Sequence, residues 1–180
     1  MKPCTVVLVH KVGCCCGSKW LTLLFLILMQ ELDAQILDKL IRFCDYQERC
    51  EADVKKKLYA LEVNNAAPYL QKLRENRFVD DARFARMFIN GRYKRLGWGK
   101  NKLLLELRKR NIAREIYQPM LDELEEGEDY MQAIQDAATK KWKSIKGKSL
   151  MDRKSKLIRF LLGKGFEMDK IRSVVGKLQD

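Results

Sequence analysis

Histidine is almost absent from this sequence, which excludes the common catalytic arrangements that depend on it. The only histidine is His10, so no Ser/His/Asp triad can be assembled from the rest of the chain. No glycine-rich phosphate loop of the Walker type is present either. The adjacent acids Asp80 and Asp81 would suit a nuclease metal site, but at a helix start they are more typical of an N-cap. We therefore predict a protein that is not an enzyme and that has no catalytic residue, no metal and no cofactor.

Cysteine is concentrated at the start of the chain. Four of the six cysteines fall within the first sixteen residues, and three of these are consecutive. Neighbouring cysteines make poor disulfide partners, and no pair of CxxC motifs exists to hold zinc. The other two, Cys44 and Cys50, lie in or beside helical pattern. We expect them to be reduced core residues of a cytoplasmic protein.

Proline and glycine are also scarce, which favours helices over strands. There are three prolines and ten glycines among 180 residues, whereas Leu, Lys, Glu, Arg and Ala are plentiful. A helical pattern begins at Met29. Apolar residues then recur every three or four positions, as in Leu32, Ile36 and Leu40. No segment alternates as a strand would, so the sequence predicts an all-α protein of nine helices.

Residues 1–28 do not share this pattern. They contain three lysines and no acid, and an apolar run from Trp20 to Met29 ends them. That run of about ten residues is too short to span a bilayer, which takes roughly twenty, and no signal-peptide cleavage site follows it. We interpret residues 1–28 as an extension foreign to the fold, with Met29 as a candidate true start, and we expect no membrane anchor. Membrane association through residues 20–29 is the alternative.

The helical part of the sequence repeats itself. The middle helix of each set ends near Leu58, Leu107 and Leu161, at spacings of 49 and 54 residues. Five positions after each leucine, an apolar residue opens the third helix. Such periodicity indicates tandem three-helix units, which we expect to form an elongated, curved array. The predicted units span residues 29–77, 78–126 and 127–180.

Charge is distributed unevenly along this array. The chain has 36 basic and 24 acidic residues, a net charge of +12. Residues 83–114 hold eleven bases and one acid, residues 115–136 hold eight acids and no base, and residues 140–164 hold ten bases and one acid. This pattern favours a polyanionic partner, namely nucleic acid, an acidic protein surface or anionic lipid. We interpret the acids of residues 122–129 as a solvated helix end, because they lack the alternating ligands of a calcium loop.

The two basic segments supply the candidate contact residues. Trp98, between Gly97 and Gly99, is either a stacking residue for single-stranded nucleic acid or a corner residue that fills the gap between two helices, and we favour the corner. The surrounding lysines and arginines could neutralise phosphates. The candidate contact residues are Arg83, Arg86, Arg92, Lys94, Arg95, Trp98, Lys100, Lys102, Arg108, Lys109, Arg110, Lys140, Lys141, Lys143, Lys146, Lys148, Arg153 and Lys154.

Three short motifs give the sequence a family resemblance. Tyr46-Gln47-Glu48-Arg49-Cys50 resembles a Tyr/Arg-x-Glu-Arg-Ser segment, with Cys50 where serine is usual. The segment FVDDARFA at residues 78–85 resembles a family signature very closely. Gly97-Trp98-Gly99-Lys100 resembles the third motif, in which Asn111 replaces a later glycine and tolerates the same left-handed backbone. The matching motif residues are Tyr46, Glu48, Arg49, Phe78, Asp80, Asp81, Arg83, Phe84, Gly97, Trp98 and Gly99.

These motifs are those of the RecX family, bacterial regulators of the recombinase RecA, and the resemblance covers about residues 30–180. It implies an all-α fold of three tandem three-helix units and a cytoplasmic, non-enzymatic protein, which we expect to be a monomer. It also implies binding to the RecA filament and to single-stranded DNA, with weak binding to duplex DNA as an open alternative. Binding to the filament lowers the recombinase, ATPase and coprotease activities of RecA in DNA repair, recombination and the SOS response, through blocked filament growth or promoted disassembly. The alternative from the residues alone is an independent nucleic-acid-binding protein with helix-turn-helix-like units.

Overall fold

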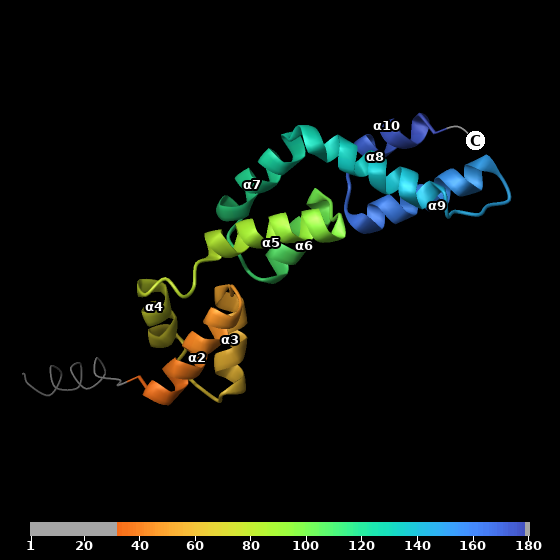
Figure 1. Ribbon diagram of the computed structural model, residues 1–180. Coiled ribbons are helices and arrows are strands. Elements are labelled where there is room, and N and C mark those ends of the chain that lie inside the picture. Colours follow the sequence, from red (N-terminus) through yellow and green to blue (C-terminus); the bar gives the residue numbers. More distant parts are fainter. Residues whose placement is uncertain (1–31, 179–180) are drawn as a thin grey trace, which may run out of the picture. The chain divides into compact units, whose positions relative to one another are not determined.

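The computed structural model describes residues 32–178, and this part of the chain contains helices and no strand. Residues 34–178 belong to one compact unit, and the prediction of an all-α fold is confirmed. The predicted extension, residues 1–28, lies outside the described residues. In chain order the helices are α2 (Ala34–Tyr46), α3 (Glu51–Ala60), α4 (Ala67–Glu75), α5 (Asp81–Leu96), α6 (Lys100–Lys109), α7 (Arg114–Glu126), α8 (Glu128–Trp142), α9 (Leu150–Lys164) and α10 (Met168–Gly176) (Figure 1).

The helices pack in three successive sets, α2–α4, α5–α7 and α8–α10, which we call repeats 1, 2 and 3. In repeat 2 both α5 and α6 pack on α7, and in repeat 3 all three helices pack on one another. No helix within residues 32–178 is long and apolar enough to cross a membrane. The short helices bury their apolar faces against their neighbours, because isolated helices of this length are unstable in water.

Each repeat has buried apolar side chains of its own. Those of repeat 1 include Leu40, Val54, Leu58 and Leu73. Those of repeat 2 are Phe84, Ala85, Ile89, Leu103, Leu107, Ile112, Tyr117 and Leu121, joined by Cys50. Those of repeat 3 are Tyr130, Ile134, Ala138, Leu157, Leu161, Phe166, Ile171, Val174 and Val175. Cys44 and Cys50 are free and buried, as predicted, and burial raises the pKa of the Cys50 thiol to about 11.

The same turn ends the middle helix of every repeat. An N–H group donates to the carbonyl of the leucine five positions earlier, at 3.1 Å for Val63, 3.4 Å for Ile112 and 3.3 Å for Phe166. The residue before each donor has a left-handed backbone, with φ of 57° at Glu62, 54° at Asn111 and 90° at Gly165. This pairing is the usual C-terminal cap of a helix. The predicted left-handed conformation of Asn111 is confirmed.

Repeats 2 and 3 meet through backbone atoms where α6 begins and α9 ends. The Gly99 N–H donates to the Lys164 carbonyl at 2.8 Å, and the Asn101 N–H donates to the Gly165 carbonyl at 2.9 Å. A Cβ atom at Gly99 would lie 2.5 Å from the Gly165 carbonyl group. A Cβ atom at Gly165 would lie 2.4 Å from the Cβ of Lys102. Only glycine at both positions allows this approach.

Alanine at Gly165 is expected to weaken the fold. The residue has φ of 90°, a conformation that costs a non-glycine residue about 1–3 kcal/mol, and the overlap with Lys102 adds to this cost. We expect Gly165→Ala to lower the free energy of unfolding in urea by at least about 2 kcal/mol. Gly163→Ala is the control, because it lies within α9 with open space at its Cβ position. That variant should be neutral or slightly stabilising, and equal midpoints for the two variants would contradict the role of this contact.

Candidate interaction surface

The two predicted basic segments lie on different repeats. Residues 83–114 cover most of α5 and all of α6, whereas residues 140–164 cover the end of α8, the next loop and α9 (Figure 1). The predicted contact residues that are exposed are Arg86, Lys94, Arg95, Arg108, Lys109, Lys140, Lys143, Lys146 and Lys148. Those that are half-buried are Arg83, Arg92, Trp98, Lys100, Lys102, Arg110, Lys141, Arg153 and Lys154.

Trp98 packs at the corner between α5 and α6. Its ring meets the Phe88 ring edge-on, with centroids 6.3 Å apart, and it packs against the core of repeat 2. The Arg92 guanidinium carbon lies 5.3 Å from its ring centroid, and the Lys102 ammonium lies 4.6 Å away. Two cations therefore contact a half-buried tryptophan, which supports the corner interpretation and keeps positive charge beside it.

A groove runs beside α5, next to the segment that joins α2 to α3. Its lining residues are Gln47, Glu48, Phe84, Met87, Phe88, Gly91, Arg92, Arg95 and Leu96. Met87 is 56% exposed and Leu96 is 39% exposed. The Nε of Arg95 donates to the Gly91 carbonyl at 3.3 Å, which holds the guanidinium along the helix. This groove thus combines exposed apolar side chains with arginines.

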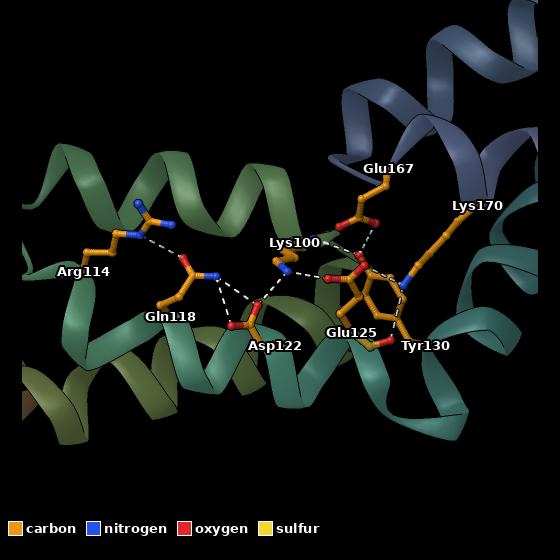
Figure 2. Close-up of polar contacts among 8 residues, drawn as sticks. All are labelled: Lys100, Arg114, Gln118, Asp122, Glu125, Tyr130, Glu167 and Lys170. Carbon is orange, nitrogen blue, oxygen red and sulfur yellow. Dashed lines mark hydrogen bonds and ion pairs between the residues drawn. The ribbon is translucent and has the colours of Figure 1, made fainter.

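Lys100 is paired with carboxylates of another helix, whereas Lys109 pairs with an acid of its own helix. The Lys100 contacts are the ones that concern the junction of repeats 2 and 3. Its side chain is 17% exposed. Its ammonium donates to Asp122 Oδ1 at 2.7 Å and also to Glu125 Oε2 (Figure 2). Asp122 in turn accepts from the Gln118 side-chain amide at 2.9 Å. Because two carboxylates of α7 occupy this ammonium, Lys100 joins α6 to α7.

The backbone of Lys100 extends the same network into repeat 3. The Lys100 N–H donates to the Tyr130 hydroxyl at 2.9 Å, and that hydroxyl donates to Glu167 Oε2 at 2.9 Å (Figure 2). Tyr130 is only 1% exposed, and burial raises the pKa of its phenol. The Lys170 ammonium lies 2.8 Å from Glu125 Oε1 and 4.9 Å from the Tyr130 ring centroid. The Gly97–Lys100 motif is therefore the junction between repeats 2 and 3.

The acids of this junction are neutralised within the protein. A hydrogen bond from Lys100 lowers the pKa of the Asp122 carboxyl, and bonds from Lys100 and Lys170 lower the pKa of the Glu125 carboxyl. Burial alone would lower the pKa of the Lys100 ammonium, but the bonds to the two carboxylates outweigh burial and raise it. Asp122 remains partly solvated as interpreted, with a side chain that is 45% exposed, whereas Glu125 is 26% exposed and paired with two lysines.

The acidic pair at the start of α5 caps two different helices. Asp80 Oδ1 accepts from the N–H groups of Ala82 and Arg83, each at 2.9 Å, which is the predicted N-cap. Asp81 Oδ1 instead accepts at 3.0 Å from the N–H of Glu51, the first residue of α3. Burial raises the pKa of the Asp81 carboxyl, although the Glu51 N–H opposes the shift. Asp81 thus joins repeat 2 to repeat 1.

The first motif lies at this join between repeats 1 and 2. Cys50 occupies the N-cap of α3 and makes no capping bond through its side chain, so the Asp81 carboxylate supplies the missing acceptor. Arg83 Nε lies 2.9 Å from Glu48 Oε1. The Arg49 guanidinium carbon lies 4.2 Å from the centroid of an aromatic ring in α2. Glu48, Asp81 and Arg83 of the motifs therefore hold repeat 1 against repeat 2.

Sequence reasoning missed the partners that repeat 3 and α7 bring to the junction. They are Asp122, Glu125, Tyr130, Glu167 and Lys170. One sequence signal was available for Lys100, which is the first residue of α6. A cation at that end of a helix faces the positive pole of the helix dipole, so it needs nearby carboxylates.

Comparison with known proteins follows the same division into repeats. Residues 80–119 match the family described as "RecX, second three-helix domain", and residues 128–175 match "RecX, third three-helix domain". The chain is 35% identical to "Regulatory protein RecX" of Pelodictyon phaeoclathratiforme over 120 residues, which cover 67% of this chain and 71% of that protein. The chain belongs to the RecX family.

Other RecX proteins agree in sequence and in fold. The chain is 30% identical to "Regulatory protein RecX" of Chlorobium phaeobacteroides over 148 residues, covering 81% of this chain and 95% of that protein. "Crystal structure of regulatory protein RecX" matches with a TM-score of 0.73 and 20% identity over 87% of each chain. "Crystal structure of RecX from Lactobacillus salivarius" matches with a TM-score of 0.68 and 20% identity, over 81% of this chain and 95% of that one. The two structures support the RecX fold.

The Lys100 network is expected to make stability depend on pH. The pKa values of Asp122 and Glu125 are lowered in the folded protein, so their stabilising bonds are present above their unfolded values, about 4. Those bonds are lost as pH falls through the lowered values. We expect Lys100→Met to lower the melting temperature at pH 7 by about 5 °C, and the difference from the unmodified protein should shrink below about pH 4.

Lys94→Met is the control for this experiment, since Lys94 is exposed on α5. It removes the same charge from the same repeat without touching the two α7 carboxylates. Melting followed by circular dichroism across the pH range compares the three proteins. A difference between Lys100→Met and the unmodified protein that stays constant with pH would contradict the network.

Proposed function

We propose that this protein is a regulator of RecA. It binds RecA and its filament on single-stranded DNA, and it lowers the recombinase, ATPase and coprotease activities by blocking filament growth or promoting disassembly. Membership of the RecX family supports this role. In the proposal the protein acts as a cytoplasmic monomer in DNA repair, recombination and the SOS response.

The groove beside α5 is the observation that carries the proposal. Exposed Met87 and Leu96 lie with Arg92 and Arg95 in one lining. Methionine and arginine are enriched in protein interfaces, and arginine is also frequent among the residues that dominate binding energy. A surface made only for phosphates needs no exposed apolar side chains. We therefore assign this groove to contact with RecA, and we leave Lys100 out of the contact surface because its charge is paired internally.

The use of the acidic pair supports a non-enzymatic role. Asp80 caps α5 and Asp81 caps α3, so both carboxylates already accept backbone hydrogen bonds. Removing either one to bind a metal would leave a helix end without its acceptor. In the proposal, regulation therefore comes from occupancy of the filament and not from chemistry on DNA.

Acidic side chains in place of an apolar and a basic residue of the groove are expected to impair RecA inhibition. We expect the double variant Met87→Glu with Arg95→Glu to need at least about tenfold more protein to inhibit the single-stranded-DNA-dependent ATPase of RecA, because about 1.4 kcal/mol of contact energy corresponds to tenfold. The control is Leu105→Glu with Arg172→Glu. It places the same charges at a 52%-exposed leucine of α6 and an exposed arginine of α10.

Comparing the two double variants distinguishes an effect of the groove on RecA inhibition from an effect of net charge. Circular dichroism should show that both retain the helical content of the unmodified protein. The proposal requires the control to inhibit RecA like the unmodified protein. Equal inhibition by all three proteins would remove the groove from the proposed contact, and inhibition lost in both variants would point to net charge instead.

A further inference from the structure

The loop that joins α8 to α9 differs in kind from the groove beside α5. Residues 143–149 contain three exposed lysines, Lys143, Lys146 and Lys148, and no arginine or acid. Lysine presents a compact point charge that binds phosphate, whereas the planar fork of arginine matches carboxylates and phosphates alike. Lys140, in the last turn of α8, is exposed as well. The two basic segments have a similar excess of basic residues in the sequence, but their exposed side chains suit different partners.

The first two turns of α9 hold this loop in place. The Lys148 N–H donates to Asp152 Oδ2 at 3.2 Å. The Lys156 ammonium donates to the Lys146 carbonyl at 3.0 Å. A Cβ atom at Gly147 would lie 2.6 Å from the Cγ of an arginine in α9, so glycine allows the loop to lie against the helix. Lys146 and Lys148 therefore extend from a backbone that α9 fixes, and the Lys143 N–H donates to a carbonyl of α8.

The one acid of this basic segment is engaged in holding the loop. Asp152 is the only acid between residues 140 and 164. Its Oδ2 accepts from the Lys156 ammonium at 2.8 Å as well as from the loop N–H. These bonds, that from Lys156 foremost, lower the pKa of the carboxyl. The acid that could oppose a bound anion is thus neutralised by the scaffold, while the loop lysines face solvent.

Aromatic rings lie among the cations of this segment. The Arg153 guanidinium carbon lies 4.1 Å from the centroid of the Trp142 ring. The Lys141 ammonium lies 5.2 Å from the Phe160 ring centroid. Met151, in the first turn of α9, is 74% exposed and offers an apolar surface to a base. Cations that track a backbone, with aromatic and apolar groups between them, are typical of surfaces that bind single strands.

We propose that residues 140–154 bind the phosphate backbone of single-stranded DNA, whereas the groove beside α5 binds protein. The assignment rests on the proposed function, in which the partner is a filament made of RecA protein and single-stranded DNA. A duplex offers no unstacked bases to the apolar side chains. An anionic membrane would need a wider apolar face than Leu150 and Met151 provide, the large exposed apolar residues of this segment. The two basic segments then contact different parts of one nucleoprotein filament.

The test measures binding of the full chain to a fluorescent oligo(dT) without RecA, at several salt concentrations. In the triple variant Lys143→Gln, Lys146→Gln and Lys148→Gln, we expect affinity to fall at least about tenfold at low salt. The slope of log affinity against log salt should shrink by about 2, because each phosphate contact on a single strand contributes about 0.7. The control is the triple variant Lys56→Gln, Lys72→Gln and Lys177→Gln, which removes three other exposed lysines.

A charge-neutral variant tests whether the fixed loop matters. Gly147→Ala removes no charge but forces the loop away from α9, so we expect it to weaken oligo(dT) binding. Gly176→Ala is its control, since a Cβ atom there meets nothing within 4 Å, and binding should not change. Melting curves of all variants confirm that each remains folded.

Two outcomes would overturn the assignment. In the first, the triple variant of Lys143, Lys146 and Lys148 binds oligo(dT) with the affinity and salt slope of the unmodified protein. In the second, this variant loses binding only to duplex DNA or only to vesicles of anionic lipid. RecA ATPase inhibition, measured in parallel, keeps the two proposals apart. If the unmodified protein fails to inhibit RecA while the loop variant loses oligo(dT) binding, the proposed function fails and the loop assignment stands.

Discussion

The contact between the start of α6 and the end of α9 is the constraint on which the junction of repeats 2 and 3 depends. Two backbone hydrogen bonds join these elements, and side chains are excluded at Gly99 and Gly165. The contact puts the Lys100 N–H against the buried Tyr130 hydroxyl and leaves the Lys100 ammonium at the unfavourable end of α6. Two carboxylates of α7 neutralise that ammonium, and one of them also holds Lys170. This one close approach thus determines where α6 begins and where Tyr130 and four charged side chains, Lys100, Asp122, Glu125 and Lys170, meet.

The same structure explains how a chain with a net charge of +12 directs positive charge outward. Several acids hold the fold from within: Asp81 caps α3, Glu125 joins two lysines at the junction, and Asp152 holds the loop before α9. Their charge is then unavailable to neutralise exposed lysines and arginines nearby. What remains at the surface differs between the repeats. Repeat 2 presents arginines with Met87 and Leu96, whereas repeat 3 presents lysines on a fixed loop.

Local signals in the sequence predicted the helices and several of their ends. The spacing of apolar residues indicated nine helices, the leucines at 49- and 54-residue intervals marked one recurring turn, and Asp80 and Asn111 behave as their residue types suggest. The internal role of Lys100 was not predictable from periodicity. Its partners lie 22 to 30 residues away on other helices, and a lysine in a basic segment looks exposed. The cap that Asp81 provides for α3, 30 residues earlier, was missed for the same reason.

Inhibition of RecA by the full chain, at low molar ratios of this protein to RecA, tests the proposed regulation of RecA most directly. The measurement follows ATP hydrolysis by RecA on single-stranded DNA while the protein is added to growing filaments. A regulator that blocks growth or promotes disassembly should stop hydrolysis well below one molecule per RecA protomer, whereas displacement by competition for DNA would need amounts comparable to the DNA sites. Hydrolysis that continues unchanged while the protein itself coats the DNA would contradict regulation of RecA.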